Sequence, residues 1–68
     1  MPSIIIEGPI LHDLDQKREL VKKITEIAEE IYHVDKSHIT ITIRGYPPED
    51  VGVGGVLISD LRARRNSS

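Results

Sequence analysis

The 68-residue sequence contains no cysteine, no tryptophan and no phenylalanine. The lack of cysteine excludes disulfide bonds and thiolate metal sites, and it leaves the redox compartment unspecified. Two tyrosines are the only aromatic residues, too few for a platform on which nucleic-acid bases could stack. The formal net charge of −2 gives no general attraction to nucleic acid or to an anionic membrane. The composition therefore predicts neither a nucleic-acid partner nor a membrane partner.

Long apolar runs are also missing. The longest is far shorter than the roughly 20 residues that a helix needs to span a bilayer. No charged segment followed by a long apolar one marks a secretory signal, so we expect a cytoplasmic protein. His12, His33 and His38 lack the spacing of metal-binding histidine motifs, and we expect no metal site and no cofactor.

The length predicts one domain over residues 1–65, followed by a polar tail at 66–68. A domain of this size buries only about 60% of the surface that its unfolded chain exposes, so a monomer would be marginally stable. Because disulfides are excluded and no metal site is expected, oligomerisation is the remaining source of support.

Three segments have clear periodicity. Three consecutive isoleucines predict a strand over residues 3–7, and strict alternation predicts a second strand over 38–44. Between them, apolar residues recur at helical spacing and Asp13 is a natural N-cap, which predicts a helix over 14–32. The apolar stripe of this helix consists of Leu20, Ile24, Ile27, Ala28 and Ile31.

The order strand, helix, strand predicts an α+β fold with a parallel strand pair and a right-handed crossover. Residues 8–13 and 45–50 are expected to form loops, and the glycine-rich residues 51–57 a tight hairpin. One helix covers only one face of a two-stranded sheet, yet the first strand carries isoleucine on both faces. An uncovered apolar face predicts a partner, and the hairpin is a candidate clasp between subunits.

Two other features have plain explanations. The glycines of residues 52–55 lack the lysine of a phosphate-binding loop, and no helix is expected after them. Arg62, Arg64 and Arg65 form a short basic run that we interpret as part of a solvated tail.

Proline at position 2 has two interpretations. The first residue of a strand tolerates proline, which needs no further explanation. Alternatively, removal of Met1 leaves a secondary amine at the chain terminus. Burial among isoleucines would lower the pKa of such an amine toward neutrality, where it could take a proton from a carbon next to a carbonyl.

The whole pattern resembles the 4-oxalocrotonate tautomerase family. The resemblance rests on Pro2 before a strand, "DQK" at 15–17 opening one long helix, an alternating second strand and "GVGG" at 52–55 in a terminal hairpin. It implies a β-α-β subunit that assembles into dimers, usually three of them in a hexamer. It also implies a tautomerase (an isomerase) in which Pro2 is the general base for keto–enol interconversion of a small 2-oxo or enol acid.

Three expected pocket residues differ from the family pattern. The family's arginines in the loop before the helix and in the second strand correspond to His12 and Thr40 here, and a pocket phenylalanine corresponds to Val51. His12 can still pair with an anion when protonated, whereas Thr40 offers only a neutral hydroxyl. Arg44 projects from the same strand face as Thr40 and could supply the missing guanidinium; Tyr46 is a weaker candidate.

These departures leave two alternatives open. The chain could be a catalytically impaired family member that serves as a structural or binding oligomer. It could instead be another enzyme built on the same prolyl amine, such as a dehalogenase or decarboxylase, for which the sequence gives no preference. The physiological substrate and the choice between dimer and hexamer are not specified by the sequence.

Overall fold

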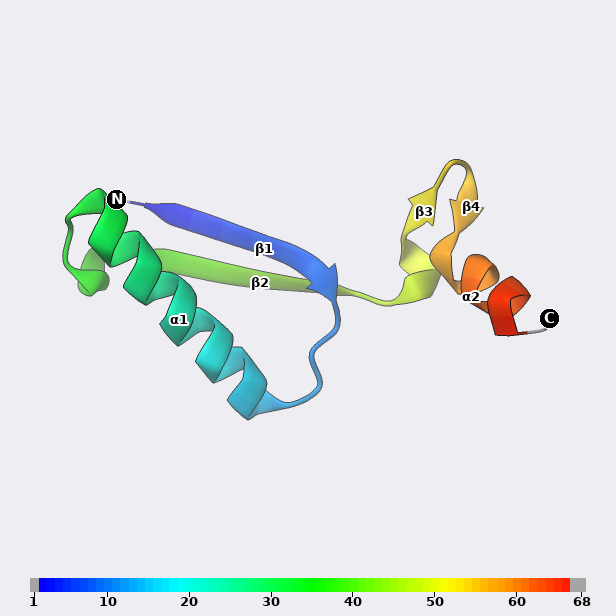
Figure 1. The fold of residues 1–68 in the computed structure, drawn as a ribbon, viewed down its shortest axis with the longest axis horizontal. Helices are drawn as coiled ribbons and strands as arrows, with labels where there is room; N and C mark the ends of the chain where they lie inside the picture. The colour runs from blue at the N-terminus through cyan, green and yellow to red at the C-terminus, as the bar shows by residue number, and fades with distance from the viewer. Residues whose placement is uncertain (1, 67–68) are drawn as a thin grey trace.

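The computed structural model describes residues 2–66, which form a β-α-β unit followed by a C-terminal arm (Figure 1). The unit consists of strand β1 (Ser3–Pro9), helix α1 (Leu14–Tyr32) and strand β2 (Thr40–Tyr46). The arm extends beyond the end of β2, and the chain measures 50 × 25 × 16 Å. The expected α+β fold is confirmed.

Strands β1 and β2 are parallel, as the sequence predicts. Their register runs from Ser3 opposite Thr40 to Pro9 opposite Tyr46. Strand β1 is two residues longer than predicted, because Gly8 and Pro9 continue the pairing instead of opening a loop. In this two-stranded sheet β1 is an edge strand, where proline is tolerated.

Strand β2 begins two residues later than predicted. A 3₁₀ helix, η1 (Lys36–His38), occupies the start of the expected strand. The carboxylate of Asp35 accepts hydrogen bonds from the backbone N–H of Ser37 at 3.0 Å and from the Ser37 hydroxyl at 2.5 Å. This local cap turns the backbone before pairing starts, so the predicted strand 38–44 is wrong at residues 38 and 39. At its other end β2 continues two residues beyond the prediction, to Tyr46.

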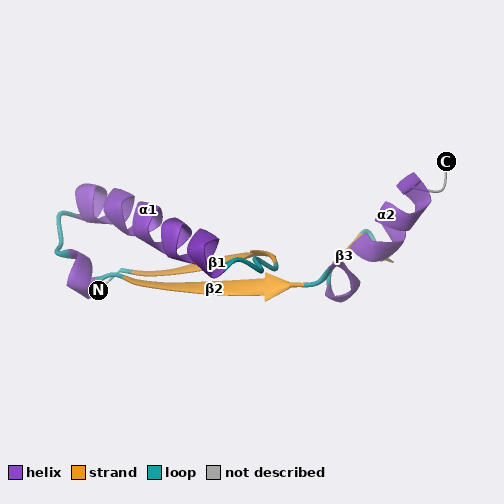
Figure 2. Ribbon diagram, turned by 90° about the horizontal axis from the view of Figure 1, so that it is seen from below, coloured by secondary structure: helices purple, strands orange, loops and turns teal. Residues whose placement is uncertain are grey.

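Helix α1 lies on one face of the strand pair, and the opposite face is open (Figure 2). Exposure alternates along both strands, so that Ile4, Ile6, Ile41 and Ile43 are half-buried on the helix side. The open face carries Ser3, Ile5 and Glu7 beside Thr40, Thr42 and Arg44. The sheet therefore has the single cover that the sequence predicts.

The limits of helix α1 agree with the prediction. The side chain of Asp13 caps its first turn by accepting a hydrogen bond from the N–H of Asp15 at 2.9 Å. The predicted apolar stripe, however, divides into two. Leu20, Ile24 and Ala28 turn inward, whereas Ile27 and Ile31 are 59% and 69% exposed.

The arm contains the predicted hairpin, formed by β3 (Gly52–Val53) and β4 (Val56–Leu57). Gly54 and Gly55 both have positive φ, 61° and 85°, as a two-residue type I′ turn requires. Helix α2 (Ile58–Asn66) follows directly. The expectation that no helix follows the glycines is therefore wrong, and the basic run lies on a helix.

Helix α2 reaches Asn66, the first residue of the predicted polar tail at 66–68. Residues 67 and 68, like Met1, lie outside the described part of the chain. A short 3₁₀ helix, η2 (Pro48–Asp50), connects β2 to the arm. It occupies half of the loop predicted at 45–50, and the first two residues of that range belong to β2.

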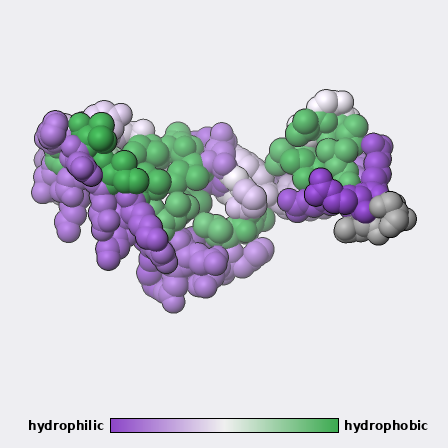
Figure 3. Space-filling view, viewed as in Figure 1, coloured by the Kyte–Doolittle hydropathy of each residue, from purple (hydrophilic) through white to green (hydrophobic). Residues whose placement is uncertain are grey.

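The described residues bury very little apolar surface. Ala28, 5% exposed, is the only buried hydrophobic residue among them. Hydrophobic surface is visible over the strand pair and over the arm (Figure 3). The exposed large apolar side chains are Ile5, Ile10, Leu14, Ile27, Ile31, Tyr32, Val53, Leu57 and Leu61.

Neither helix within residues 2–66 is long and apolar enough to cross a membrane.

Candidate active site

Pro2 and Thr40 lie together at the amino-terminal end of the strand pair. The carbonyl of Pro2 accepts a hydrogen bond from the backbone N–H of Thr40 at 3.0 Å. Pro2 is half-buried and Thr40 is exposed. The two positions that the resemblance assigns to the general base and to a substrate contact are thus adjacent in one chain.

A polar cluster of Glu7, Arg44 and Tyr46 lies toward the other end of the strands. The Tyr46 hydroxyl donates a hydrogen bond to Oε2 of Glu7 at 2.8 Å, and Nη1 of Arg44 is 3.9 Å from the same oxygen. The hydrogen bond to the Glu7 carboxylate raises the pKa of Tyr46 above its usual range. Arg44 acts in the opposite direction, because its positive charge favours the phenolate.

Arg44 shares the exposed strand face with Thr40, as the alternation predicts. It lies four residues farther along the strand, a separation of about 13 Å. The Arg44 guanidinium approaches Glu7 of its own chain rather than Pro2. Within one subunit, Arg44 therefore belongs to the end of the sheet opposite to Pro2.

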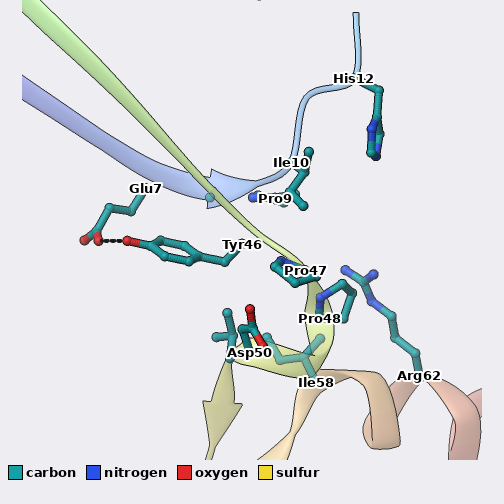
Figure 4. A pocket seen from close by; sticks show the side chains of 12 residues that line it. Glu7, Pro9, Ile10, His12, Tyr46, Pro47, Pro48, Asp50, Ile58 and Arg62 are labelled. Atoms are coloured by element: carbon teal, nitrogen blue, oxygen red, sulfur yellow. Dashed lines mark hydrogen bonds between the residues drawn. The ribbon is translucent and has the colours of Figure 1, made fainter.

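A cavity of about 720 Å³ opens where β1, β2 and the arm meet (Figure 4). Its size is within the range of small-molecule sites. His12 lies on the side of the loop that follows β1, and Arg62 approaches from helix α2. The remaining lining residues are Glu7, Gly8, Pro9, Ile10, Tyr46, Pro47, Pro48, Asp50, Val51 and Ile58.

The close approach of two segments shapes one wall of this cavity. A Cβ atom at Gly45 would lie only 2.9 Å from the Cα of Ile10, so a side chain at position 45 would push the β1–α1 loop away. At Gly8, the register partner of Gly45, a Cβ would meet no atom within 4 Å. The glycine at position 45 thus lets the loop that carries His12 pack onto β2.

The predicted site residues fall into two groups within one chain. His12 and Val51 line the cavity, whereas Pro2 and Thr40 lie at the far end of the strands. The seven residue steps from Pro2 to Pro9 correspond to about 23 Å of extended chain. One subunit therefore does not bring its own Pro2 to its own cavity.

Arg62 is the cavity residue that sequence reasoning missed. The sequence assigns Arg62 to a solvated tail because the basic run is short and isolated. The one available signal is the spacing of Ile58 and Arg62, four residues apart and therefore on one face of a helix.

Within residues 2–66, no group of three or more His, Asp or Glu side chains is placed to hold a metal ion.

Known proteins similar to this chain agree in family. The family model described as tautomerase enzyme matches residues 2–61. DmpI from Archaeoglobus fulgidus is 52% identical, with 87% of this chain and 100% of that one covered and a TM-score of 0.79. YwhB, a homologue of 4-oxalocrotonate tautomerase, is 27% identical, with 87% and 97% covered and a TM-score of 0.80.

A heterohexameric 4-oxalocrotonate tautomerase from Chloroflexus aurantiacus is 26% identical. The alignment covers 91% of this chain and 100% of that one, with a TM-score of 0.80. No curated protein matches the chain. The similarity to these solved structures includes both the β-α-β unit and most of the arm.

Proposed function

The chain belongs to the tautomerase family, and from that premise we propose that it is an isomerase with Pro2 as its general base. Its substrate class is a small 2-oxo acid or the corresponding enol. The position of Pro2 is the observation that carries this proposal. It directly precedes β1, is half-buried, and is tied to β2 through the Thr40 N–H.

The proposed chemistry needs the nitrogen of Pro2 to be free, which removal of Met1 achieves. The neutral secondary amine takes a proton from a carbon next to the carbonyl, so that a C–H bond breaks while an N–H bond forms. The electron pair moves onto the carbonyl oxygen, and the same proton returns to a different atom of the substrate. The cycle balances without an oxidant, a reductant or a cofactor.

We further propose that the chain works as an oligomer, a dimer or a hexamer built as a trimer of dimers. A single chain buries almost no apolar side chain, and Ile5 on its open sheet face is 52% exposed. A small domain with so little core needs additional burial for stability. Assembly also supports catalysis, because a second subunit can bring its Pro2 to the cavity of the first.

The test of the mechanism is the variant Pro2→Ala. We expect it to lose on the order of 10²–10⁴ in kcat/KM for the ketonisation of enol-phenylpyruvate or a 2-hydroxymuconate, because the proton acceptor is removed. Intact mass spectrometry must first show that Met1 is absent from both proteins. Turnover equal to that of the unsubstituted protein would eliminate Pro2 as the base.

Ser3→Ala is the matched control, since Ser3 is the exposed neighbour of Pro2 and forms no part of the proposed site. It should retain activity within about twofold, in line with the small effect of most exposed substitutions. Light scattering should give the same oligomeric mass for both variants. A lower mass for Pro2→Ala alone would mean that the activity loss reflects assembly.

The alternative is a catalytically impaired member that acts as a structural or binding oligomer. One observation favours it: Thr40, adjacent to Pro2, offers a neutral hydroxyl that cannot balance an enolate charge. This alternative predicts a stable oligomer that ketonises neither substrate. Robust ketonisation of either one by the purified protein would exclude it.

A further inference from the structure

Helix α2 brings a guanidinium to the cavity. Ile58 and Arg62 are one helical turn apart, so Ile58 contributes apolar surface while Arg62 reaches the mouth. Figure 4 shows the Arg62 guanidinium directed toward the side on which His12 lies, with Pro47 and Pro48 between helix and loop. Two basic side chains from separate segments therefore face one opening.

The two acidic residues that line the cavity, Glu7 and Asp50, form no ion pair with Arg62, so they leave its positive charge without a partner among them. Glu7 accepts its hydrogen bond from Tyr46 and has Arg44 nearby, at the end of the cavity away from Arg62 (Figure 4). Asp50 lies on η2, and it forms no ion pair with Arg62. Among the described residues, the Arg62 side chain has neither a hydrogen bond nor an ion pair.

The other walls near Arg62 are apolar. Pro9, Ile10, Pro47, Pro48 and Ile58 line the cavity between the side chains of His12 and Arg62. Such a surface favours a ligand with a hydrophobic body, and the Arg62 guanidinium favours a negative group at one end of that ligand. A guanidinium binds a carboxylate through two parallel hydrogen bonds, which a lysine in the same position does not reproduce.

We propose that Arg62 is a substrate-binding residue, which holds the carboxylate of an acid whose apolar body lies on this wall. This inference rests on the proposed function and makes it more specific. The arginine for the substrate carboxylate comes from helix α2 instead of from the loop position occupied by His12. The preferred substrate is a monocarboxylate with an apolar substituent, of the arylpyruvate type.

Binding of an unreactive probe tests Arg62 without any turnover. We use 3-phenylpropionate as the acid and 3-phenylpropanamide as its neutral counterpart, and we measure dissociation constants by NMR titration. Arg62→Gln should weaken acid binding by about tenfold or more, because a charge-assisted pair is lost, and leave amide binding unchanged. Arg62→Lys should recover only part of the loss.

Lys22→Gln is the matched control, because it removes the same charge from an exposed position on α1 outside the cavity. It should leave acid binding unchanged. Equal affinity of Arg62→Gln and the unsubstituted protein for the acid would overturn the proposal. So would an equal loss in Lys22→Gln, since the effect would then reflect net charge alone.

Kinetics separate this proposal from the function on which it rests. Pro2→Ala should bind 3-phenylpropionate normally while losing turnover, and Arg62→Gln should raise KM for phenylpyruvate more than it lowers kcat. Unchanged turnover in Pro2→Ala, together with weak acid binding in Arg62→Gln, would exclude the proposed mechanism but support the binding site. Lost turnover in Pro2→Ala, together with unchanged acid binding in Arg62→Gln, would exclude only the role of Arg62.

Discussion

The two ends of the parallel strand pair differ in what they offer to a substrate. The amino-terminal end holds Pro2, the proposed proton acceptor, beside the neutral side chain of Thr40. The other end holds a cavity with His12 and Arg62 at its opening. One end has the proposed chemistry and the other has the binding surface, and about 23 Å of strand separates them.

Parallel topology explains this division. In a parallel pair both strands start at one end of the sheet, so the residues before them gather there and the following loops gather at the other end. Pro2 lies seven residues along the chain from Pro9 at the cavity, and no change of side-chain rotamer can close that distance. The proposed site would consequently combine Pro2 of one chain with the cavity of another, in line with the large exposed apolar surface of a single chain.

Mixed oligomers test this division most strongly. Pro2→Ala lacks the base, and His12→Glu places a negative charge at the cavity opening, so each variant alone should be nearly inactive. When the two are co-expressed, some sites combine an intact Pro2 with an intact cavity. We expect activity well above that of either parent, measured as ketonisation by the purified mixed oligomer.

The control for this experiment replaces His12→Glu by a chain that carries both substitutions. That chain contributes neither an intact base nor an intact cavity opening, so its mixture with Pro2→Ala should stay inactive. If the first mixture gave only the mean activity of its parents, the site would lie within one chain. The separation of the two ends would then have no functional meaning.

The sequence predicts the regular parts of this fold because their signals are local. Asp13 caps α1 at the predicted residue, and the two glycines at 54 and 55 adopt the positive φ that a tight hairpin needs. The start of β2 differs from the prediction because the Asp35 carboxylate accepts a hydrogen bond from the backbone N–H of Ser37 and turns the chain there. Alternation alone carries no information about that competition.

The candidate site was less accessible from sequence, because it depends on contacts between distant segments. The alternation correctly places Arg44 on the face of Thr40, but it does not indicate that Glu7 of the same chain lies beside the guanidinium. Helix α2 has weak apolar periodicity, so the position of Arg62 at a cavity follows only from the fold.

Gly8 and Gly45 are opposite each other in the strand register, but only Gly45 is in close contact with another segment. Substituting each of them in turn therefore tests the packing at the cavity end of the strands. Gly45→Ala places a methyl group against the backbone of Ile10, so either the β1–α1 loop moves or the strand bends. We expect a loss of about 1–3 kcal/mol in the free energy of unfolding and weaker binding of 3-phenylpropionate. Urea denaturation and NMR titration measure the two effects.

Gly8→Ala is the control for that substitution, since the two glycines are opposite each other in the strand register. A methyl group at Gly8 meets no atom within 4 Å, and alanine also lowers the entropy of the unfolded chain. Stability should be unchanged or slightly increased. If both variants lost stability equally, the contact of Ile10 with β2 would not shape the cavity end.

The smallest expected effect concerns the proton on Tyr46. Its pKa lies above the ordinary value of 10.0, chiefly because the hydroxyl donates to Glu7. In a Tyr32→Phe background, where Tyr46 is the only phenol, Glu7→Gln should lower the pKa, since a neutral amide replaces the carboxylate. Arg44→Gln should raise it, because the cation that favours the phenolate is removed.

The direction of the pH effect on stability follows from the same shift. A folded-state pKa above the unfolded one means that the folded chain holds this proton more tightly. The stabilisation is therefore complete below pH 10 and is lost as the pH rises through the raised pKa. The stability difference from a Tyr46→Phe variant should shrink over that interval, as urea denaturation at successive pH values can measure.

An ultraviolet titration in which Glu7→Gln left the Tyr46 pKa unchanged would show that this pair does not form in solution. The charges at the cavity end would then be independent of one another, and Glu7 would be free to oppose Arg62 in attracting an anionic substrate.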